Sequence, residues 1–224
     1  MENSEIKEKK KKRIIGSMIF LAIAWLSGSL TFYSAPDIEA RVIDANTGKP
    51  VEGVVLVGVW QLESQGFEHS YGRAIHVTEA VTDSEGKYKL DGFFIKWAGL
   101  FAGTLWESDP MIYVFADGYS PRIAHSDNYN AVLEHDTGFY RRSPHDGRDV
   151  LMRKIPLNTR YVAQVWYSQV RRLIDAGNCS ATKLPSLTNL LERVEPQYNV
   201  ILKDSTGFNN KPFNEKKEYC STGP

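Results

Sequence analysis

Two residues in one short segment have types and spacing that suit zinc chemistry. His76 and Glu79 form a His-x-x-Glu pattern, which is the spacing of two zinc ligands in a zinc peptidase. Residues 76–82, however, alternate as in a β-strand, and strand positions three apart point to opposite faces. The two side chains therefore cannot share a metal as they stand, and the pattern does not predict a zinc peptidase.

Three histidines, each followed within two residues by an aspartate, lie in polar sequence that predicts loops: His125, His135 and His145. Imidazole and carboxylate suit several divalent cations, but this spacing fits no metal-binding motif, so solvated loop residues are the favoured interpretation. The sequence also lacks a G-x-S-x-G motif, a phosphate-binding loop and a dinucleotide fingerprint. We predict no catalytic residue, metal or cofactor, and keep a metal-dependent hydrolase that uses the His/Asp loops as a weak alternative.

Five aromatic residues suggest another kind of site, a flat platform for a sugar ring or a peptide. They are Trp60, Tyr71, Trp97, Trp106 and Tyr113. Packing in a core is the favoured interpretation, because aromatic side chains bury large areas in small β-sandwiches. Exposed aromatic rings would instead indicate a carbohydrate- or cell-wall-binding module.

The elements that position these residues begin with residues 38–60, which predict two strands around a polar turn. Apolar residues alternate with others over residues 38–44, and residues 54–60 are rich in β-branched valine. The intervening residues 45–50 contain Asn, Gly and Pro, which favour a bend. The pattern predicts a β-hairpin.

A second hairpin is predicted to join residues 76–82 to residues 87–90 through an Asp-Ser-Glu-Gly turn. We expect Asp44, Asn46 and Asp83 to bond to turn backbones rather than to calcium. Further segments are predicted as loops at residues 61–75 and 135–148, and as strands or strand edges at residues 111–116, 119–121, 131–133 and 150–155.

Residues 92–106 contain eight large apolar side chains in a segment too short and too glycine-rich to cross a bilayer. Such a segment needs a cover. We expect the C-terminal helix of the protein to provide it, with a partner surface or a nearby membrane as the alternatives. The candidate partner surface consists of Phe94, Trp97, Phe101 and Trp106.

The C-terminal part predicts two amphipathic helices and one disulfide. Apolar residues recur at spacings of three and four over residues 159–176 and again over residues 186–195, where Pro196 ends the second helix. Two cysteines, Cys179 and Cys220, exclude a four-cysteine zinc site and a C-x-x-C redox motif. In an oxidising compartment they predict a disulfide, with two free thiols as the alternative.

The N-terminus predicts attachment to a membrane. Residues 7–13 carry six Lys and Arg side chains, and residues 14–33 follow without a charge, long enough for a helix to cross a hydrocarbon core of about 30 Å. The positive-inside rule leaves the N-terminus in the cytoplasm, at the cell inner (plasma) membrane, with the remainder periplasmic or extracellular. We favour an uncleaved, single-pass signal anchor. The small residues at positions 27–29 leave signal-peptide cleavage and secretion as the alternative.

The charge balance argues against a nucleic-acid partner. The chain has 27 basic and 27 acidic residues, and the part after the first thirteen residues keeps 21 basic and 24 acidic ones. This mildly acidic body lacks the basic surface that binding to a phosphate backbone needs.

Three motifs occur in a characteristic order. They are Thr47-Gly48-Lys49-Pro50, then Thr82-Asp83 through Gly86 to Tyr88, then Val114-x-Ala116-x-Gly118-Tyr119. Over residues 37–155 this order resembles the carboxypeptidase regulatory-like domain, a transthyretin-like β-sandwich, in a membrane-anchored protein of bacterial type. The resemblance implies a non-catalytic sandwich. Members are attached to peptidases, outer-membrane receptors and surface proteins without one shared ligand.

The predicted protein is thus mainly β, a transthyretin/prealbumin-like β-sandwich with an N-terminal transmembrane helix and a C-terminal helical extension. We expect it to be no enzyme, but a module that binds a protein partner or supports assembly at the cell envelope. A carbohydrate- or cell-wall-binding module is the first alternative. The predicted parts are a cytoplasmic basic segment (1–13), a signal anchor (14–34), the sandwich (37–155) and the helical extension (156–224).

Overall fold

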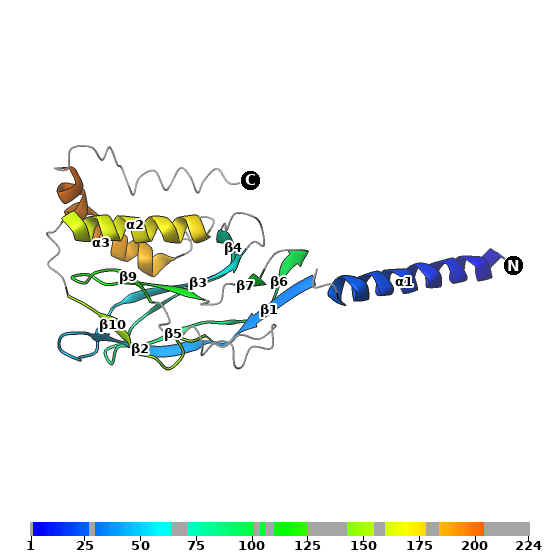
Figure 1. The fold of residues 1–224 in the computed structure, drawn as a ribbon, viewed down its shortest axis with the longest axis horizontal. Helices are drawn as coiled ribbons and strands as arrows, with labels where there is room; N and C mark the ends of the chain where they lie inside the picture. Colours follow the sequence, from blue (N-terminus) through cyan, green and yellow to red (C-terminus); the bar gives the residue numbers. More distant parts are fainter. Residues whose placement is uncertain are drawn as a thin grey trace.

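Two β-sheets and a pair of helices lie in three successive layers in the computed structural model of this chain, and a third helix projects from one end (Figure 1). The structure describes residues 2–26, 30–63, 71–100, 104–105, 110–124, 143–154, 160–177 and 184–203. The fold is mainly β with a few helices, as predicted.

Backbone pairing divides the strands into three sets. The first sheet has the order β10 (Val150–Met152), β2 (Ile38–Asp44), β5 (Lys87–Leu90). The second has the order β4 (Tyr71–Val81), β3 (Val55–Glu63), β8 (Met111–Phe115), β9 (Arg122–Ala124), with β7 (Thr104–Leu105) also paired to β3. A separate two-stranded ribbon consists of β1 (Leu30–Ala35) and β6 (Phe93–Leu100). The helices are α1 (Glu2–Leu26), α2 (Arg160–Gly177) and α3 (Pro185–Lys203).

Strand β3 is buried on both of its faces and therefore connects the three layers. Leu56 and Trp60 lie in the core between the two sheets, whereas Val57 and Val59 belong to the cluster formed with α2 and α3. Alternate side chains of a strand point to opposite faces, so a strand that is apolar at consecutive positions needs a cover on each side.

Both predicted hairpins are wrong, because the members of each pair belong to different sheets. β2 pairs with β5 and β10, whereas β3 pairs with β4, β7 and β8. The physical reason is a difference between their faces. Glu39 and Arg41 give β2 an exposed polar face, while β3 has no such face. One face of β2 is therefore open to solvent, whereas β3 has a cover on each face, and the links from β2 to β3 and from β4 to β5 cross between sheets.

Aspartate side chains hold the turns at these crossing links, as predicted. Asp44 Oδ1 accepts hydrogen bonds from the backbone N–H groups of Asn46 at 2.8 Å and Thr47 at 3.0 Å, and its Oδ2 accepts one from the Tyr119 hydroxyl at 3.0 Å. These donors lower the pKa of Asp44. Asp83 accepts in the same way from two later backbone N–H groups of its own turn.

Helices α2 and α3 cover the outer face of the second sheet. Trp166 is fully buried, and its ring centroid lies 5.3 Å from that of Phe115. Glu79 of β4 accepts hydrogen bonds from the backbone N–H groups of Ser186 at 2.9 Å and Leu187 at 3.2 Å. The first N–H groups of a helix lack partners within it and carry partial positive charge, so this carboxylate joins α3 to the sheet.

Two further predictions need correction. The predicted loop at residues 61–75 is wrong at both ends. β3 continues to Glu63, and β4 begins at Tyr71. The second C-terminal helix does not end at Pro196, since α3 continues through this residue to Lys203. Helix α2 is confirmed close to its predicted bounds. The predicted strand at residues 131–133 and the first part of the loop that follows lie outside the described residues.

The N-terminal apolar run is divided between a helix and a strand. α1 ends at Leu26, and Leu30–Ala35 form β1, so the predicted helix over residues 14–34 is wrong at its C-terminal end. The Thr, Phe and Tyr side chains of this end suit a strand, and β6 supplies the pairing partner. Among the described residues, the helices include none with the length and apolar character needed to cross a membrane.

Replacing Glu79 by alanine should weaken the attachment of α3. Two N–H groups would lose their acceptor, and we expect the free energy of unfolding to fall by about 1–2 kcal/mol. Urea unfolding followed by circular dichroism measures this change. Glu79→Gln is the matched control, because it keeps an acceptor oxygen without the charge and should lose less. Equal stability of the alanine variant and the parent would contradict the capping role.

Candidate functional site

The candidate functional surface is the β1–β6 ribbon, which continues the first sheet toward α1 (Figure 1). In the sheet, Ile38 of β2 lies opposite Leu90 of β5. In the ribbon, Ala35 of β1 lies opposite Phe93 of β6. Since β1 leads into β2 and β5 leads into β6, the two antiparallel pairs form one continuous structure with a short junction between them.

A β-bulge in β6 turns two consecutive side chains outward. The register shifts between Tyr33 and Ala35, where Phe94 and Ile95 together stand against the single residue Ser34. An extra residue of this kind bends the bulged strand and changes which face its side chains reach. In the ribbon, both residues of the bulge are exposed.

The outer face of the ribbon is apolar and exposed. Phe94 is 85% exposed, Trp97 61%, Ile95 58% and Phe32, which stands opposite Trp97, 37%. On the inner face Tyr33 is buried in the core between the sheets. One exposed apolar residue is ordinary, but four on one face of a ribbon form a patch of the kind that binds a partner or a membrane.

The apolar half of α1 lies next to this patch along the chain. Five of its large side chains are between 46% and 70% exposed, namely Ile14, Ile15, Met18, Ile19 and Phe20. They follow the exposed basic residues of the same helix. Four Cα steps separate Leu26, the end of α1, from Leu30, the start of β1, so the two are at most about 14 Å apart.

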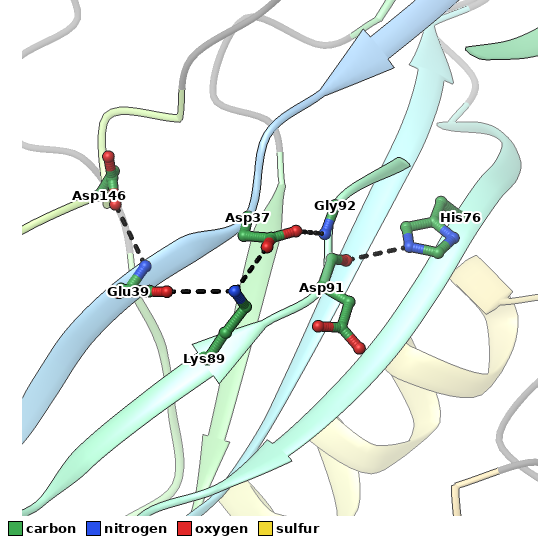
Figure 2. A network of polar contacts seen from close by, with 7 residues as sticks. All are labelled: Asp37, Glu39, His76, Lys89, Asp91, Gly92 and Asp146. Carbon is green, nitrogen blue, oxygen red and sulfur yellow. Dashed lines mark hydrogen bonds and ion pairs between the residues drawn. The ribbon is translucent and has the colours of Figure 1, made fainter. Parts of the chain in front are cut away.

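A polar network fixes the junction between sheet and ribbon, as Figure 2 shows. Asp37 accepts a hydrogen bond from the Gly92 backbone N–H at 2.9 Å and pairs with the Lys89 ammonium at 2.7 Å. Lys89 also contacts Glu39 at 3.2 Å. The Lys89 hydrogen bond and the Gly92 N–H lower the pKa of Asp37, so the carboxylate stays charged. The network thus joins the start of β2 to the link between β5 and β6.

On its inner side the ribbon is tied to β4 through a histidine. His76 Nε2 lies 3.1 Å from the Asp91 carbonyl oxygen, which can only accept, so this nitrogen carries the hydrogen (Figure 2). The other ring nitrogen is then an acceptor, and Lys96 Nζ lies 2.7 Å from it and 3.1 Å from the Ile75 carbonyl oxygen. The Lys96 ammonium therefore donates twice to β4, and we call this pair the His76–Lys96 latch.

Aromatic rings surround the latch and make it less polar. The His76 ring centroid lies 5.0 Å from those of Trp60 and Phe93, and the latter two are 5.7 Å apart. Burial, and then the Lys96 charge, lower the pKa of His76, and burial lowers the pKa of Lys96. His76 is therefore neutral at pH 7, as an acceptor for Lys96 must be.

Only two of the four residues of the predicted partner surface lie among the described residues. Phe94 and Trp97 are exposed on the ribbon, while Phe101 and Trp106 lie outside the described residues. The expectation that a C-terminal helix covers this segment is wrong for both exposed residues, because α2 and α3 pack on the second sheet. The predicted disulfide between Cys179 and Cys220 also lies outside the described residues.

The other candidate sites can be followed only in part, because His125, His135 and Trp106 lie outside the described residues. Trp60 and Tyr113 are 1% exposed, so the favoured interpretation, packing in a core, is confirmed for these two residues. His76 points to the latch and Glu79 to α3, which confirms that they face opposite sides of β4. His145 is buried in a turn. Within the described part of the chain, no three His, Cys, Asp or Glu side chains are placed to hold a metal.

Sequence reasoning missed an open groove of about 740 Å³ beside β5. Its lining includes Tyr88, Ala40 and Ala80, with charged side chains around them. The Tyr88 hydroxyl is buried with no hydrogen-bond partner among the described residues, and burial raises its pKa. Its position opposite Ala40 in the sheet leaves the space. Only the strand pairing brings these residues together, so no sequence signal marks the groove.

Comparison with known proteins gives no family assignment. No family model and no curated protein matches the chain. Among solved structures, hydroxyquinol 1,2-dioxygenase from Pseudomonas putida DLL-E4 is similar over 55% of this chain and 57% of its own, with 16% identity and a TM-score of 0.29. For 3-chlorocatechol 1,2-dioxygenase from Rhodococcus opacus 1CP the shares are 56% and 62%, with 12% identity and a TM-score of 0.29. The chain thus matches less than two thirds of these proteins, and TM-scores this low assign neither fold family nor activity.

Replacing Gly92 by alanine should disrupt the junction. An added Cβ would lie 2.1 Å from the Ala35 carbonyl oxygen and 2.5 Å from Pro36 backbone atoms, which cannot move without displacing β1. We expect a loss of about 2 kcal/mol or more in the free energy of unfolding. Amide hydrogen exchange should also rise in β1 and β6. The control is Gly118→Ala, where the added atom meets open space and only a φ of 79° opposes it. Protection of β1 and β6 that is unchanged in Gly92→Ala would contradict this account.

Mild acid should loosen the latch. The pKa of His76 is lowered in the folded protein, so the unfolded chain takes up the proton first, and stability should fall as the pH drops below about 6.5. Above about pH 7 this group should have no effect. Urea unfolding at about pH 7.5 and about pH 5.5 measures the slope, which should be smaller in His76→Gln. Asp37 and Asp44 do not contribute to this slope. Their pKa values are lowered from 3.8, so both carboxylates are ionised at the two pH values. Equal slopes in the two proteins would rule out the latch as the cause.

Proposed function

We propose that this protein is a non-catalytic β-sandwich module attached to a cell membrane through its N-terminal segment, and that it acts by binding or assembly with a protein partner at the cell envelope. The observation that carries the proposal is the exposed apolar half of α1, which follows an exposed basic stretch. The sheets would lie on the periplasmic or extracellular side of the inner (plasma) membrane. Secretion after cleavage is the alternative.

The physical argument for a membrane is the sequence of surface types along α1. Residues 7–13 carry six Lys and Arg side chains, of which Lys12 pairs with Glu8 at 3.1 Å on an exposed face. Basic residues near an anionic bilayer contribute about 1 kcal/mol each. Apolar side chains such as Met18 and Phe20, which are 64% and 70% exposed, gain free energy when they leave water. An anionic lipid surface can attract the basic half of the helix and also take up its apolar half.

The proposal of a carboxypeptidase regulatory-like, transthyretin-like sandwich is supported by the role of its motif residues. Gly86 has a φ of 72°, and an added Cβ would lie 2.6 Å from the Val42 carbonyl oxygen, so the turn that joins the two sheets accepts only glycine. Tyr119 reaches back to Asp44, which holds the Thr-Gly-x-Pro turn. These motif residues therefore stabilise the scaffold.

Vesicle flotation of the full chain tests the proposal. With phosphatidylcholine vesicles that contain about 30% phosphatidylglycerol, the full chain should float. A variant with Lys9, Lys10, Lys11 and Lys12 changed to Gln should bind about tenfold or more weakly, because four attractive charges are lost. The control changes Lys49 and Lys154, exposed residues of the sandwich, to Gln. A full chain that does not float with the vesicles would contradict membrane attachment.

A further inference from the structure

The outer face of the ribbon has the opposite character from the outer face of the sheet that it continues. In β2 and β5, the exposed positions hold charged residues such as Glu39, Arg41 and Lys89. Beyond the junction, the sequences LTFYSA of β1 and FFIKWAGL of β6 contain no acidic residue and only one basic residue, Lys96. The single charge is directed inward to the latch. Charge therefore disappears from the outer face at the junction.

Nothing among the described residues covers this face. The C-terminal helices pack on the second sheet and share no cluster with the ribbon. Phe94 and Trp97 keep 85% and 61% of their surface exposed, although burial of large apolar side chains stabilises a folded protein. The latch and the junction hold the inner face against the sandwich, so the outer face is directed away from it.

The ribbon lies close along the chain to the segment that is proposed to enter the membrane. β1 begins within about 14 Å of the end of α1, and Phe32, its third residue, stands opposite Trp97. A bilayer that takes up the apolar half of α1 is therefore within reach of this pair. Tryptophan and other aromatic rings are favoured at the level of the lipid headgroups, where one side of the ring is apolar and the other is wet.

We propose that the outer face of the β1–β6 ribbon is a second membrane contact, in which Phe32, Phe94, Ile95 and Trp97 lie in the headgroup region of the bilayer beside α1. This inference rests on the proposed attachment through α1. It adds that the sandwich does not move freely on a tether. The ribbon seats it on the lipid in one orientation, with the acidic residues of the junction, such as Asp37 and Glu39, marking the boundary with water.

Depth measurement with spin labels tests the contact on the full chain. Labels are attached at Phe94→Cys and Trp97→Cys, with Cys179 and Cys220 changed to Ser, in vesicles of phosphatidylcholine with about 30% phosphatidylglycerol. Control labels are placed at Glu52→Cys and Asp117→Cys, which are exposed on the sandwich. Collisions with oxygen, which concentrates in lipid, are compared with collisions with a water-soluble nickel chelate. Both ribbon labels should favour oxygen several-fold over the controls.

A pair of variants without labels provides an independent measurement. Phe94→Ser with Trp97→Ser should lower the vesicle partition coefficient about tenfold, because two large apolar side chains leave the lipid. Val81→Ser with Leu151→Ser is the matched control, since both residues are 47% exposed on the sandwich, and it should leave the coefficient unchanged.

The outcomes separate the two proposals. A chain that floats while its ribbon labels remain as accessible to the chelate as the controls would overturn the ribbon contact and leave the attachment through α1 intact. A chain that does not float overturns both. Ribbon labels that are shielded from both reagents in native membranes, yet accessible to the chelate in pure lipid, would assign the face to a protein partner and overturn the lipid contact.

Discussion

The need of strand β3 for a cover on each face is the constraint on which the rest of the structure depends. From Val55 to Leu62, its even-numbered side chains, such as Leu56, and its odd-numbered ones, such as Val57, are buried. One set requires the first sheet and the other requires α2 and α3. Each layer therefore exists because the central strand would otherwise expose an apolar face, and the links that cross between the sheets follow from the same requirement.

The sequence predicted elements better than it predicted their pairing. Strand β2 has its predicted bounds, and α2 nearly so, because period-two and three-to-four spacings report which side chains face a core. Such spacings do not report which sheet a strand joins. The continuous apolar run of β3 indicates that this strand needs a cover on each face, but it does not indicate that the strand pairs with the partly buried β4 and not with β2.

The candidate site was only half predictable for a related reason. Phe94 and Trp97 were identified by their apolar density, but their exposure depends on a bulge and on long-range contacts of His76 that have no local signature. The segment at Leu30–Ala35 was misassigned because an uncharged run suits a membrane helix and a strand alike. Its partner β6 lies 58 or more residues away, and that pairing decides between them. The Tyr88 groove likewise exists only through strand pairing.

The junction explains how one antiparallel pair can serve two environments. A strand pair whose outer face had the same kind of residue along its whole length would be either exposed to solvent or buried along that whole face. Here the polar half ends at the junction, where Asp37 pairs with Lys89 and accepts a hydrogen bond from the Gly92 backbone N–H. The charges next to the apolar half are therefore paired. On the inner side a neutral His76 accepts from the only ammonium of the ribbon and keeps it off the outer face. The outer face is therefore apolar both because its residues are apolar and because the single charge of the ribbon is held on the inner side. For this reason we interpret it as the surface that is proposed to contact the bilayer and not as an incompletely covered core.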